Sequence, residues 1–253
     1  MIYSILNDGD KMKKNIKELI LNLIYPPRCV FCLKRLSPKT KLHVCSECAN
    51  SLPYARAYSR CRRCGKPVAE NADKMCKRCY TGKHYITRIT SAFVYVDNAK
   101  DAVVRFKSER NSGFAKTLAL YVAGMVNYDF GGAEFDAVVS VPPRKKGITE
   151  EKFDQAACLA DAVARRLGIP YIPKAMAQVG VSRKQSSLSY SARIENVKGK
   201  FVVKRPGSID KKTILLIDDV CTSGATLEEC GKVLKDSGAY RVYGATVATV
   251  PDI

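Results

Sequence analysis

Hydrophobic and polar residues follow two different periods along the chain, and each period predicts one kind of element. Some segments are short, apolar and rich in β-branched residues, as β-strands are. Others repeat apolar residues every three or four positions, which is the spacing of one helical face. The expected strands are 85–96, 136–144, 212–219 and 240–250. The expected helices are 99–107, 114–127, 152–167 and 225–237.

The strands and helices alternate, an order that is typical of βαβ units. We therefore predict an α/β fold over this part of the chain, with a parallel sheet covered by helices on both faces. Residues 174–199 are rich in Ser, Arg and Lys and predict a loop or a mobile lid.

Near the start of the chain, residues 16–24 carry apolar side chains at helical spacing. They predict a short amphipathic helix that packs on its own protein; binding to a membrane surface is the alternative. No apolar run approaches the ~20 residues that cross a bilayer. Asn22 interrupts the stretch, and Pro26 and Pro27 stand where a secretory signal has small residues. We expect a cytoplasmic protein without a transmembrane segment.

Eight of the eleven cysteines form four C-x-x-C pairs separated by 12, 12 and 11 residues. Each pair places two sulfurs on one tight turn, and two such turns complete a tetrahedral zinc site. We predict two structural Cys₄ zinc sites rather than free thiols or disulfides, with sequential pairing favoured over interleaved pairing. His43 and His84 are not needed as ligands. The expected ligands are Cys29, Cys32, Cys45, Cys48, Cys61, Cys64, Cys76 and Cys79.

These patterns divide the chain into three expected parts. They are an N-terminal amphipathic helix at 1–28, a double zinc ribbon at 29–84 and the α/β domain at 85–253.

The formal net charge of +19 is concentrated near the start of the chain, because residues 1–90 hold 19 Lys and Arg against 6 Asp and Glu. This is the expected docking region for a polyanion such as single-stranded DNA. Alternatively, the charges only solvate a small metal-binding domain. The residues that motivate DNA binding are Arg60, Arg62, Arg63, Lys77 and Arg78, with Tyr54, Tyr58 and Tyr80 available to stack on bases.

The stretch 214–227, ILLIDDVCTSGATL, carries the clearest chemistry. A buried strand is followed by two acids, by a loop of small and hydroxyl-bearing residues, and by a helix. Backbone N–H groups of such a loop, with the helix N-terminus behind them, form an anion pocket suited to a phosphate. The adjacent acids are suited to hydroxyl groups or to a cation. A sugar phosphate satisfies both halves of this pattern.

IDDVCTSGAT resembles the phosphoribosyl pyrophosphate (PRPP) motif of type I phosphoribosyltransferases. The resemblance implies a type I phosphoribosyltransferase-like sheet. It also implies that Asp218 and Asp219 are the catalytic acids, which hold the ribose hydroxyls directly or through Mg²⁺. The 5′-phosphate would lie on 222–226. The motif as a whole comprises Asp218, Asp219, Val220, Cys221, Thr222, Ser223, Gly224, Ala225 and Thr226.

A wider resemblance joins this domain to the cysteine pairs. A Cys₄ module entered through PPRCVFC and followed by a transferase domain is similar to the ComF competence-protein family. That resemblance implies a role in DNA uptake, beside a separate helicase-like ATPase. The matching positions are Val141, Pro142, Phe153, Gln155, Arg183, Gln185, Leu188, Arg193, Asn196, Gly199 and Phe201.

This chain departs from the family pattern at one helix start. Glu151 and Asp154 stand where the family has an arginine and an asparagine. Acids at these positions would repel a substrate with several phosphate charges, so PRPP binding is better supported than turnover. The strand end with Pro143, Arg144 and Lys145 would still cradle pyrophosphate.

Three further groups have two interpretations each. Lys107 either contacts phosphate or is a solvated helix end, and Arg183 either closes over pyrophosphate as part of a lid or is a loop charge. We interpret Cys221 as the variable position of the motif and not as a nucleophile. No P-loop sequence is present.

The sequence thus predicts Mg²⁺-dependent transfer of ribose 5-phosphate from PRPP, or from a related sugar phosphate, to an acceptor that it does not identify. The alternative is a non-catalytic adaptor that senses a nucleotide and binds single-stranded DNA or a helicase.

Overall fold

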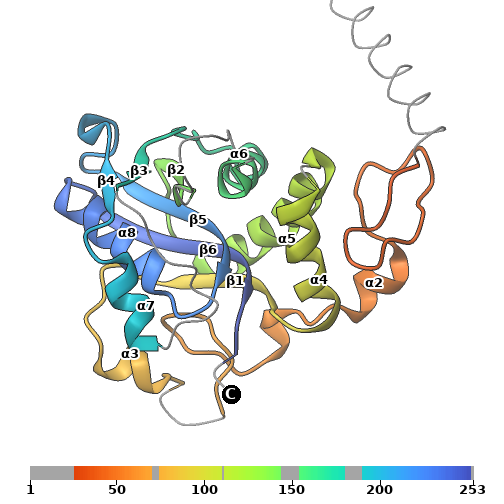
Figure 1. The fold of residues 1–253 in the computed structure, drawn as a ribbon, viewed down its shortest axis with the longest axis horizontal. Coiled ribbons are helices and arrows are strands. Elements are labelled where there is room, and N and C mark those ends of the chain that lie inside the picture. Colours follow the sequence, from red (N-terminus) through yellow and green to blue (C-terminus); the bar gives the residue numbers. More distant parts are fainter. Residues whose placement is uncertain (1–25, 70–73, 110, 144–153, 180–189, 252–253) are drawn as a thin grey trace, which may run out of the picture.

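The centre of the molecule is a four-stranded parallel sheet with the order β1-β6-β5-β2 (Figure 1). The computed structural model describes residues 26–69, 74–109, 111–143, 154–179 and 190–251, so the helix expected at 16–24 lies outside the described residues. Each strand overlaps one of the four segments expected to be strands, and β5 continues two residues beyond its expected end at 219. The strands are β1 Ile89–Val94, β2 Ala137–Ser140, β5 Thr213–Cys221 and β6 Arg241–Thr249.

Helices cover both faces of this sheet, as the alternation of elements predicts. Helices α4, α5 and α6 contribute to one hydrophobic core, and α8 contributes to the other. The parallel sheet with flanking helices confirms the expected fold class. No described helix combines the length and the apolar composition needed to cross a membrane. The helices are α4 Asp97–Ser108, α5 Ser112–Phe130, α6 Gln155–Leu167 and α8 Ala225–Asp236.

Strand β5 lies in the interior of the sheet, between β6 and β2. Its side chains alternate between the two faces, so that Leu215 and Ile217 enter one core and Ile214 and Leu216 enter the other. Burial on both faces explains why the sequence shows a continuous apolar run here rather than an alternation.

The expectation of a loop over 174–199 is wrong for the part that the structure describes. This segment contains strand β3 Met176–Gln178, which pairs antiparallel with β4 Phe201–Val203, and helix α7 Tyr190–Val197. Met176 and Val197 are buried in the core beneath α8. A three-residue strand and an eight-residue helix are too short to produce a clear period, so burial rather than pattern identifies them.

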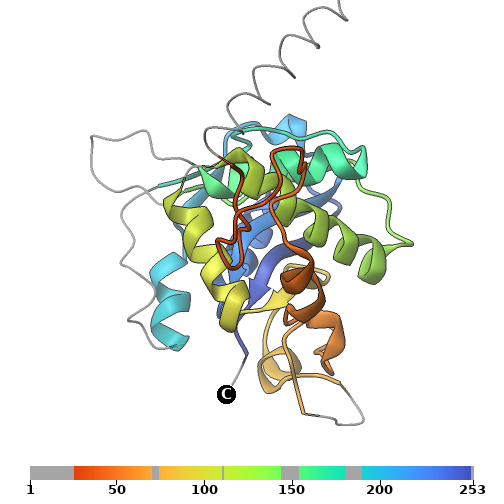
Figure 2. The same ribbon diagram turned by 90° about the vertical axis from the view of Figure 1, so that its right-hand side faces the viewer.

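The first ribbon, residues 29–48, ends inside helix α2 Ser46–Ser51 and packs beside α4 and α5 (Figures 1 and 2). Phe31 is fully buried, with its ring 5.6 Å from that of Phe93 and 6.1 Å from that of Tyr121. Arg105 of α4 donates hydrogen bonds to the carbonyl oxygens of Val30 and Phe31. The ribbon therefore contributes to the main core and is not a separate appendage.

The second ribbon, residues 61–79, includes helix α3 Lys77–Thr81 and joins the sheet at the start of β1. The amide of Ile89 donates to the carbonyl of Arg63 over 2.7 Å, and the Arg63 guanidinium donates to the carbonyl of Ile86 over 3.2 Å. Gly65 has a φ of +69°, and a side chain there would approach the Ile89 carbonyl oxygen to 2.7 Å. Only glycine permits so close a contact between the ribbon and the strand.

A buried ion pair fastens the start of the second ribbon to the end of α5. Arg60 donates two hydrogen bonds, of 2.7 and 3.0 Å, to the two carboxylate oxygens of Asp129, and the Thr90 hydroxyl donates a third. The side chains of Arg60 and Asp129 are only 15% and 8% exposed.

The Asp129→Ala substitution should lower the free energy of unfolding by about 3 kcal/mol at neutral pH, because it leaves the Arg60 guanidinium buried without a partner. Urea denaturation measures this change. The matched control is Asp161→Ala, which removes an exposed i,i+4 pair with Arg165 and should cost less than about 1 kcal/mol.

The pH dependence of this difference has a definite sign. Burial alone would raise the pKa of Asp129, but the hydrogen bonds from Arg60 and Thr90 outweigh burial and hold the pKa below its usual value of 3.8. A depressed folded-state pKa contributes stability above the unfolded-state pKa, and this contribution is lost as the pH falls through the folded-state value. The gap between wild type and Asp129→Ala should therefore narrow below a pH of about 4; a constant gap would contradict this assignment.

Candidate functional site

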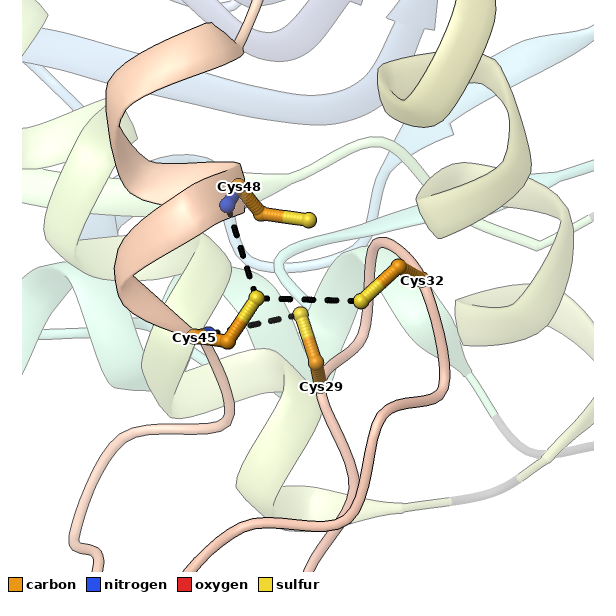
Figure 3. Close-up of side chains that lie close together, drawn as sticks. All are labelled: Cys29, Cys32, Cys45 and Cys48. Atoms are coloured by element: carbon orange, nitrogen blue, oxygen red, sulfur yellow. Dashed lines mark hydrogen bonds between the residues drawn. The ribbon is translucent and has the colours of Figure 1, made fainter.

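The cysteine pairs gather into two clusters of four sulfurs. Within each cluster all four sulfur atoms lie within 4.8 Å of one another. In the first cluster, shown in Figure 3, the sulfurs of Cys32 and Cys45 are 3.7 Å apart, and in the second those of Cys64 and Cys76 are also 3.7 Å apart. The clusters are Cys29, Cys32, Cys45 and Cys48, and Cys61, Cys64, Cys76 and Cys79.

These distances fit zinc and do not fit disulfides. A tetrahedron with Zn–S bonds of about 2.3 Å has S···S edges of about 3.8 Å. A disulfide requires an S–S distance of about 2.05 Å. The thiolate donor set and the four-fold closure fit two structural Zn²⁺ ions, which would hold each ribbon together and leave no position for a substrate.

The clusters confirm sequential pairing of the C-x-x-C turns. The two histidines of the ribbons bond elsewhere. His43 Nδ1 donates to the Arg28 carbonyl oxygen over 3.1 Å, and its ring meets Phe114 edge-on. His84 donates from Nε2 to the Cys79 carbonyl oxygen over 3.2 Å and from Nδ1 to Glu228 over 3.1 Å.

The other candidate site lies where β5 ends and α8 begins. The carboxyl end of β5 carries the acids, and residues 222–224 connect it to the first turn of α8. The first amides of a helix have no partner inside the helix and point toward the preceding loop. Together with the helix dipole they favour an anion such as phosphate.

Gly224 makes this sharp turn possible. Its φ is +77°, in the left-handed region that glycine adopts without strain. Its carbonyl oxygen accepts the first hydrogen bond of the helix, from the Glu228 amide over 2.9 Å. The Ala225 amide donates to the Ser223 hydroxyl over 3.3 Å, which further fixes the loop.

The two acids at the end of β5 have different partners. Asp218 accepts a hydrogen bond from the Asp219 amide over 2.8 Å. Asp219 forms an ion pair with Lys107, whose Nζ lies 3.0 Å from its carboxylate. Burial alone would lower the pKa of Lys107, but the charge and hydrogen bond of Asp219 outweigh that effect and raise it. Lys107 thus lies beside the acids at the end of β5, with its side chain 48% exposed, and its contact with a phosphate stays a prediction.

A third carboxylate, at the start of α6, lies within electrostatic range of Asp219. Asp154 caps this helix by accepting a hydrogen bond from the Ala157 amide over 2.9 Å. Burial and the nearby charge of Asp219 raise its pKa, although the helix amides partly oppose this. Gln155 donates to the Lys107 carbonyl oxygen over 3.0 Å, so the start of α6 and the end of α4 are held together.

Cys221 contributes to the site through its backbone only. Its side chain is 1% exposed, and burial raises its pKa to about 11. A buried neutral thiol is a poor nucleophile, which agrees with the interpretation of Cys221 as the variable position of the motif.

Sequence reasoning missed Glu228, in the first turn of α8. Its carboxylate accepts hydrogen bonds from the amides of Tyr85 and Ile86, over 2.7 and 3.2 Å, in addition to the one from His84. An acid in a first helical turn is common because it suits the helix dipole. No local pattern indicates that its partners lie more than 140 residues away.

The structure brings together most of the predicted residues that it describes. Asp218, Asp219, Lys107 and the loop lie at one edge of the sheet. Pro143 follows β2 at the same edge, because Val141 donates to the Ile217 carbonyl oxygen in the neighbouring strand. Outside the described residues lie Arg144, Lys145, Glu151, Phe153, Arg183, Gln185 and Leu188.

Comparison with protein families matches both parts of the chain. Residues 20–80 match the double zinc ribbon domain, and residues 154–252 match the phosphoribosyl transferase domain. The two matches agree with the cysteine clusters and with the strand–loop–helix site described above.

Curated relatives resemble the chain over most of its length. A DNA utilization protein YhgH of Salmonella typhimurium is 28% identical over 87% of this chain and 96% of its own length. Competence protein F of Haemophilus influenzae is 25% identical over 85% of this chain and 93% of its own. Competence protein ComFC of Bacillus subtilis is 26% identical over 83% of each. The chain thus joins a double zinc ribbon to a phosphoribosyl transferase domain, and over most of its length it is similar to competence protein F and competence protein ComFC.

Proposed function

We propose that this protein binds PRPP with Mg²⁺ at the carboxyl edge of its sheet and transfers ribose 5-phosphate to a nucleophilic acceptor. The carrying observation is the arrangement at the end of β5, where two acids and Lys107 adjoin a loop suited to phosphate. The loop from Thr222 to Thr226 would hold the 5′-phosphate. Asp218 and Asp219 would hold the ribose hydroxyls, directly or through Mg²⁺.

The proposed reaction breaks the bond between the ribose anomeric carbon and the pyrophosphate oxygen, and forms a bond from that carbon to the acceptor. Pyrophosphate leaves with the bonding electron pair, and the acceptor loses its proton to solvent. Mg²⁺ would supply positive charge to the leaving pyrophosphate. The protein's part is to hold phosphate and ribose at separate points, so that the anomeric carbon is oriented toward the acceptor.

Lys107 has a defined part in this proposal. Its ammonium neutralises Asp219 before a ligand arrives, and it lies close enough to exchange that partner for a phosphate oxygen when the ribose hydroxyls or Mg²⁺ occupy the carboxylate. Because Lys107 is on α4 and the loop precedes α8, the ligand would bridge two elements that are far apart in the sequence.

Isothermal titration calorimetry tests the binding step. Wild type should bind PRPP more tightly with Mg²⁺ than without it, and Asp219→Asn should weaken binding at least about tenfold because the substitution removes a charged partner. The matched control Asp236→Asn, an exposed acid at the far end of α8, should leave the affinity unchanged. Failure of wild type to bind PRPP or ribose 5-phosphate would contradict the proposal.

Turnover is tested by incubating the protein with PRPP, Mg²⁺ and a panel of nucleobases and amines. Release of pyrophosphate with one acceptor supports the transferase and identifies the acceptor class. Tight binding without release from any acceptor, beside an active phosphoribosyltransferase as control, would instead support the non-catalytic, nucleotide-sensing adaptor.

Asp154 should weaken the affinity for PRPP, because its carboxylate stands beside Asp219 in a site that receives phosphate groups. Asp154→Asn keeps the helix cap, since Asn caps as well as Asp does, and removes one negative charge. The affinity for PRPP should rise by up to about tenfold.

The matched control for this change is Asp161→Asn, which removes a charge from the same helix where it pairs with Arg165. An equal gain in both variants would show a general effect of net charge, and no gain in Asp154→Asn would show that its charge does not reach the ligand.

A second candidate function is binding of single-stranded DNA by the second ribbon, in keeping with the DNA-related names of the relatives. Tyr80 is 74% exposed on α3, three residues after the exposed Lys77, so a base could stack on the ring while the ammonium contacts a phosphate. Three residues expected in this surface have structural partners instead. Arg60 binds Asp129, Arg63 binds Ile86, and Tyr54 packs in the core and donates to the Ala49 carbonyl oxygen.

Tyr80→Ala combined with Lys77→Ala should weaken the affinity for a fluorescent single-stranded oligonucleotide by roughly tenfold or more at low salt. Tyr128→Ala, which removes a similarly exposed ring (66%) from α5, is the control. Point variants are preferable to removing residues 1–90, because the first ribbon shares the core of the sheet and the second is hydrogen-bonded to the start of β1. Unchanged affinity in the double variant would show that Tyr80 and Lys77 do not contribute to DNA binding and would contradict this candidate function.

A further inference from the structure

The second zinc ribbon and the phosphate-binding loop are connected by a short series of hydrogen bonds. Glu228 lies four residues after Gly224, and its own amide makes the first helical bond to the Gly224 carbonyl oxygen. Its carboxylate accepts hydrogen bonds from three groups of the segment that leaves the ribbon, namely the amides of Tyr85 and Ile86 and the ring of His84. The side chains of Glu228 and His84 are 24% and 14% exposed, so solvent competes weakly for these bonds.

The other end of this series reaches the metal site. His84 Nε2 donates to the carbonyl oxygen of Cys79, one of the four cysteines of the second cluster, over 3.2 Å. Histidine Nδ1 and Nε2 lie on opposite sides of the ring, so His84 bridges Cys79 and Glu228. The order is therefore Cys79, His84, Glu228 and the first turn of α8.

Close packing supports the same connection. A side chain at Gly231, on α8, would approach the Ile86 side chain to 2.5 Å, so this helix rests directly on the segment after the ribbon.

We propose that Glu228 and His84 are positioning residues that couple the second Cys₄ site to the phosphate-binding loop. Zinc at Cys61, Cys64, Cys76 and Cys79 fixes the Cys79 carbonyl; His84 and Glu228 then fix the first turn of α8, and with it the loop amides. Metal loss from this site weakens the binding of a sugar phosphate without any contact between metal and ligand. The identity of the ligand rests on the function proposed above, but the coupling itself does not.

The first ribbon provides the contrast. Its contacts run to α4 and α5, through Arg105 to the Val30 and Phe31 carbonyls and through the His43 amide to the Thr117 hydroxyl over 2.7 Å. The first metal site thus supports the helix that carries Lys107, and the second supports the loop.

Hydrogen exchange of the ligand-free, zinc-loaded protein tests the coupling. Glu228→Ala removes all three acceptor bonds and should raise the exchange rate of the loop amides that are hydrogen-bonded, those of Ala225 to Ser223 and of residue 228 to Gly224, by about tenfold or more. Glu228→Gln should exchange at nearly the wild-type rate. Its amide oxygen accepts from Tyr85 and Ile86, and its amide nitrogen donates to a neutral His84 that still donates to Cys79.

The matched control is Glu229→Ala. Glu229 lies on the same turn of α8, and its carboxylate accepts a hydrogen bond of 2.7 Å from the Gly199 amide, away from the ribbon. Its loss should leave the loop amides at the wild-type rate. Equal loop exchange in Glu228→Ala and Glu229→Ala would overturn the positioning role.

Variants of the zinc ligands test whether the second zinc site, rather than the first, controls the loop. Cys76→Ser should lose the second zinc and raise exchange at the loop amides, whereas Cys45→Ser should lose the first zinc and raise exchange on α4 instead. His84→Ala, which leaves the zinc ligands intact, should give a smaller increase at the loop and keeps the test valid if Cys76→Ser does not fold. Loop exchange that is unchanged in His84→Ala would overturn transmission through this residue.

Affinity for PRPP with Mg²⁺ completes the test. It should fall in Glu228→Ala by a factor similar to the rise in loop exchange, and it should recover in Glu228→Gln. If wild type does not bind PRPP while the exchange differences hold, the proposed function fails and the coupling stands. If wild type binds and Glu228→Ala binds equally well, the coupling has no bearing on the ligand and the proposal fails.

Discussion

The ion pair between Lys107 and Asp219 determines how the site is assembled. Asp219 follows Asp218 at the end of a buried strand, and the carboxylate of Asp154 lies within range of its charge. Their mutual repulsion requires a nearby cation. Lys107 supplies it from α4, with Nζ 3.0 Å from Asp219. For this contact α4 must end beside the carboxyl edge of β5, and the bond from Gln155 to the Lys107 carbonyl oxygen holds α6 at the same place.

The two ribbons support this arrangement from outside the sheet. A Cys₄ unit of some twenty residues has too little apolar surface for a core of its own, so its folding depends on metal and on burial against a neighbour. The first ribbon buries Phe31 against Phe93 and Tyr121 and holds α4 through Arg105. The second holds α8 through His84 and Glu228. Each ribbon is thus joined to one of the two elements that a bound sugar phosphate would bridge.

Local sequence patterns predict the elements and motifs that neighbouring residues form, and they miss the contacts between residues that are distant in the sequence. The strands, the main helices, the zinc ligands and the acid–loop motif all have short-range signatures, and the structure contains each of them where it is described. The pairs Arg60–Asp129 and His84–Glu228 join residues 69 and 144 positions apart, so no local pattern of hydrophobic and polar residues indicates them. The sequence does not distinguish a phosphate contact from a solvated helix end for Lys107, because its partner Asp219 lies on another element. Strand β3 and helix α7 escaped prediction because they are short and depend on burial in the core beneath α8.

The distribution of charge in the site limits the ligands that suit it. The loop and the start of α8 favour an anion, while Asp218, Asp219 and Asp154 favour hydroxyl groups or a cation. A ligand with phosphate at one end and hydroxyls at the other satisfies both regions. A further pyrophosphate would lie near Asp154 and be repelled unless a divalent cation accompanied it. If the site takes PRPP as proposed, the carboxylate at position 154 would make binding depend more strongly on Mg²⁺ than an amide would, while a ribose 5-phosphate without pyrophosphate would avoid most of that repulsion.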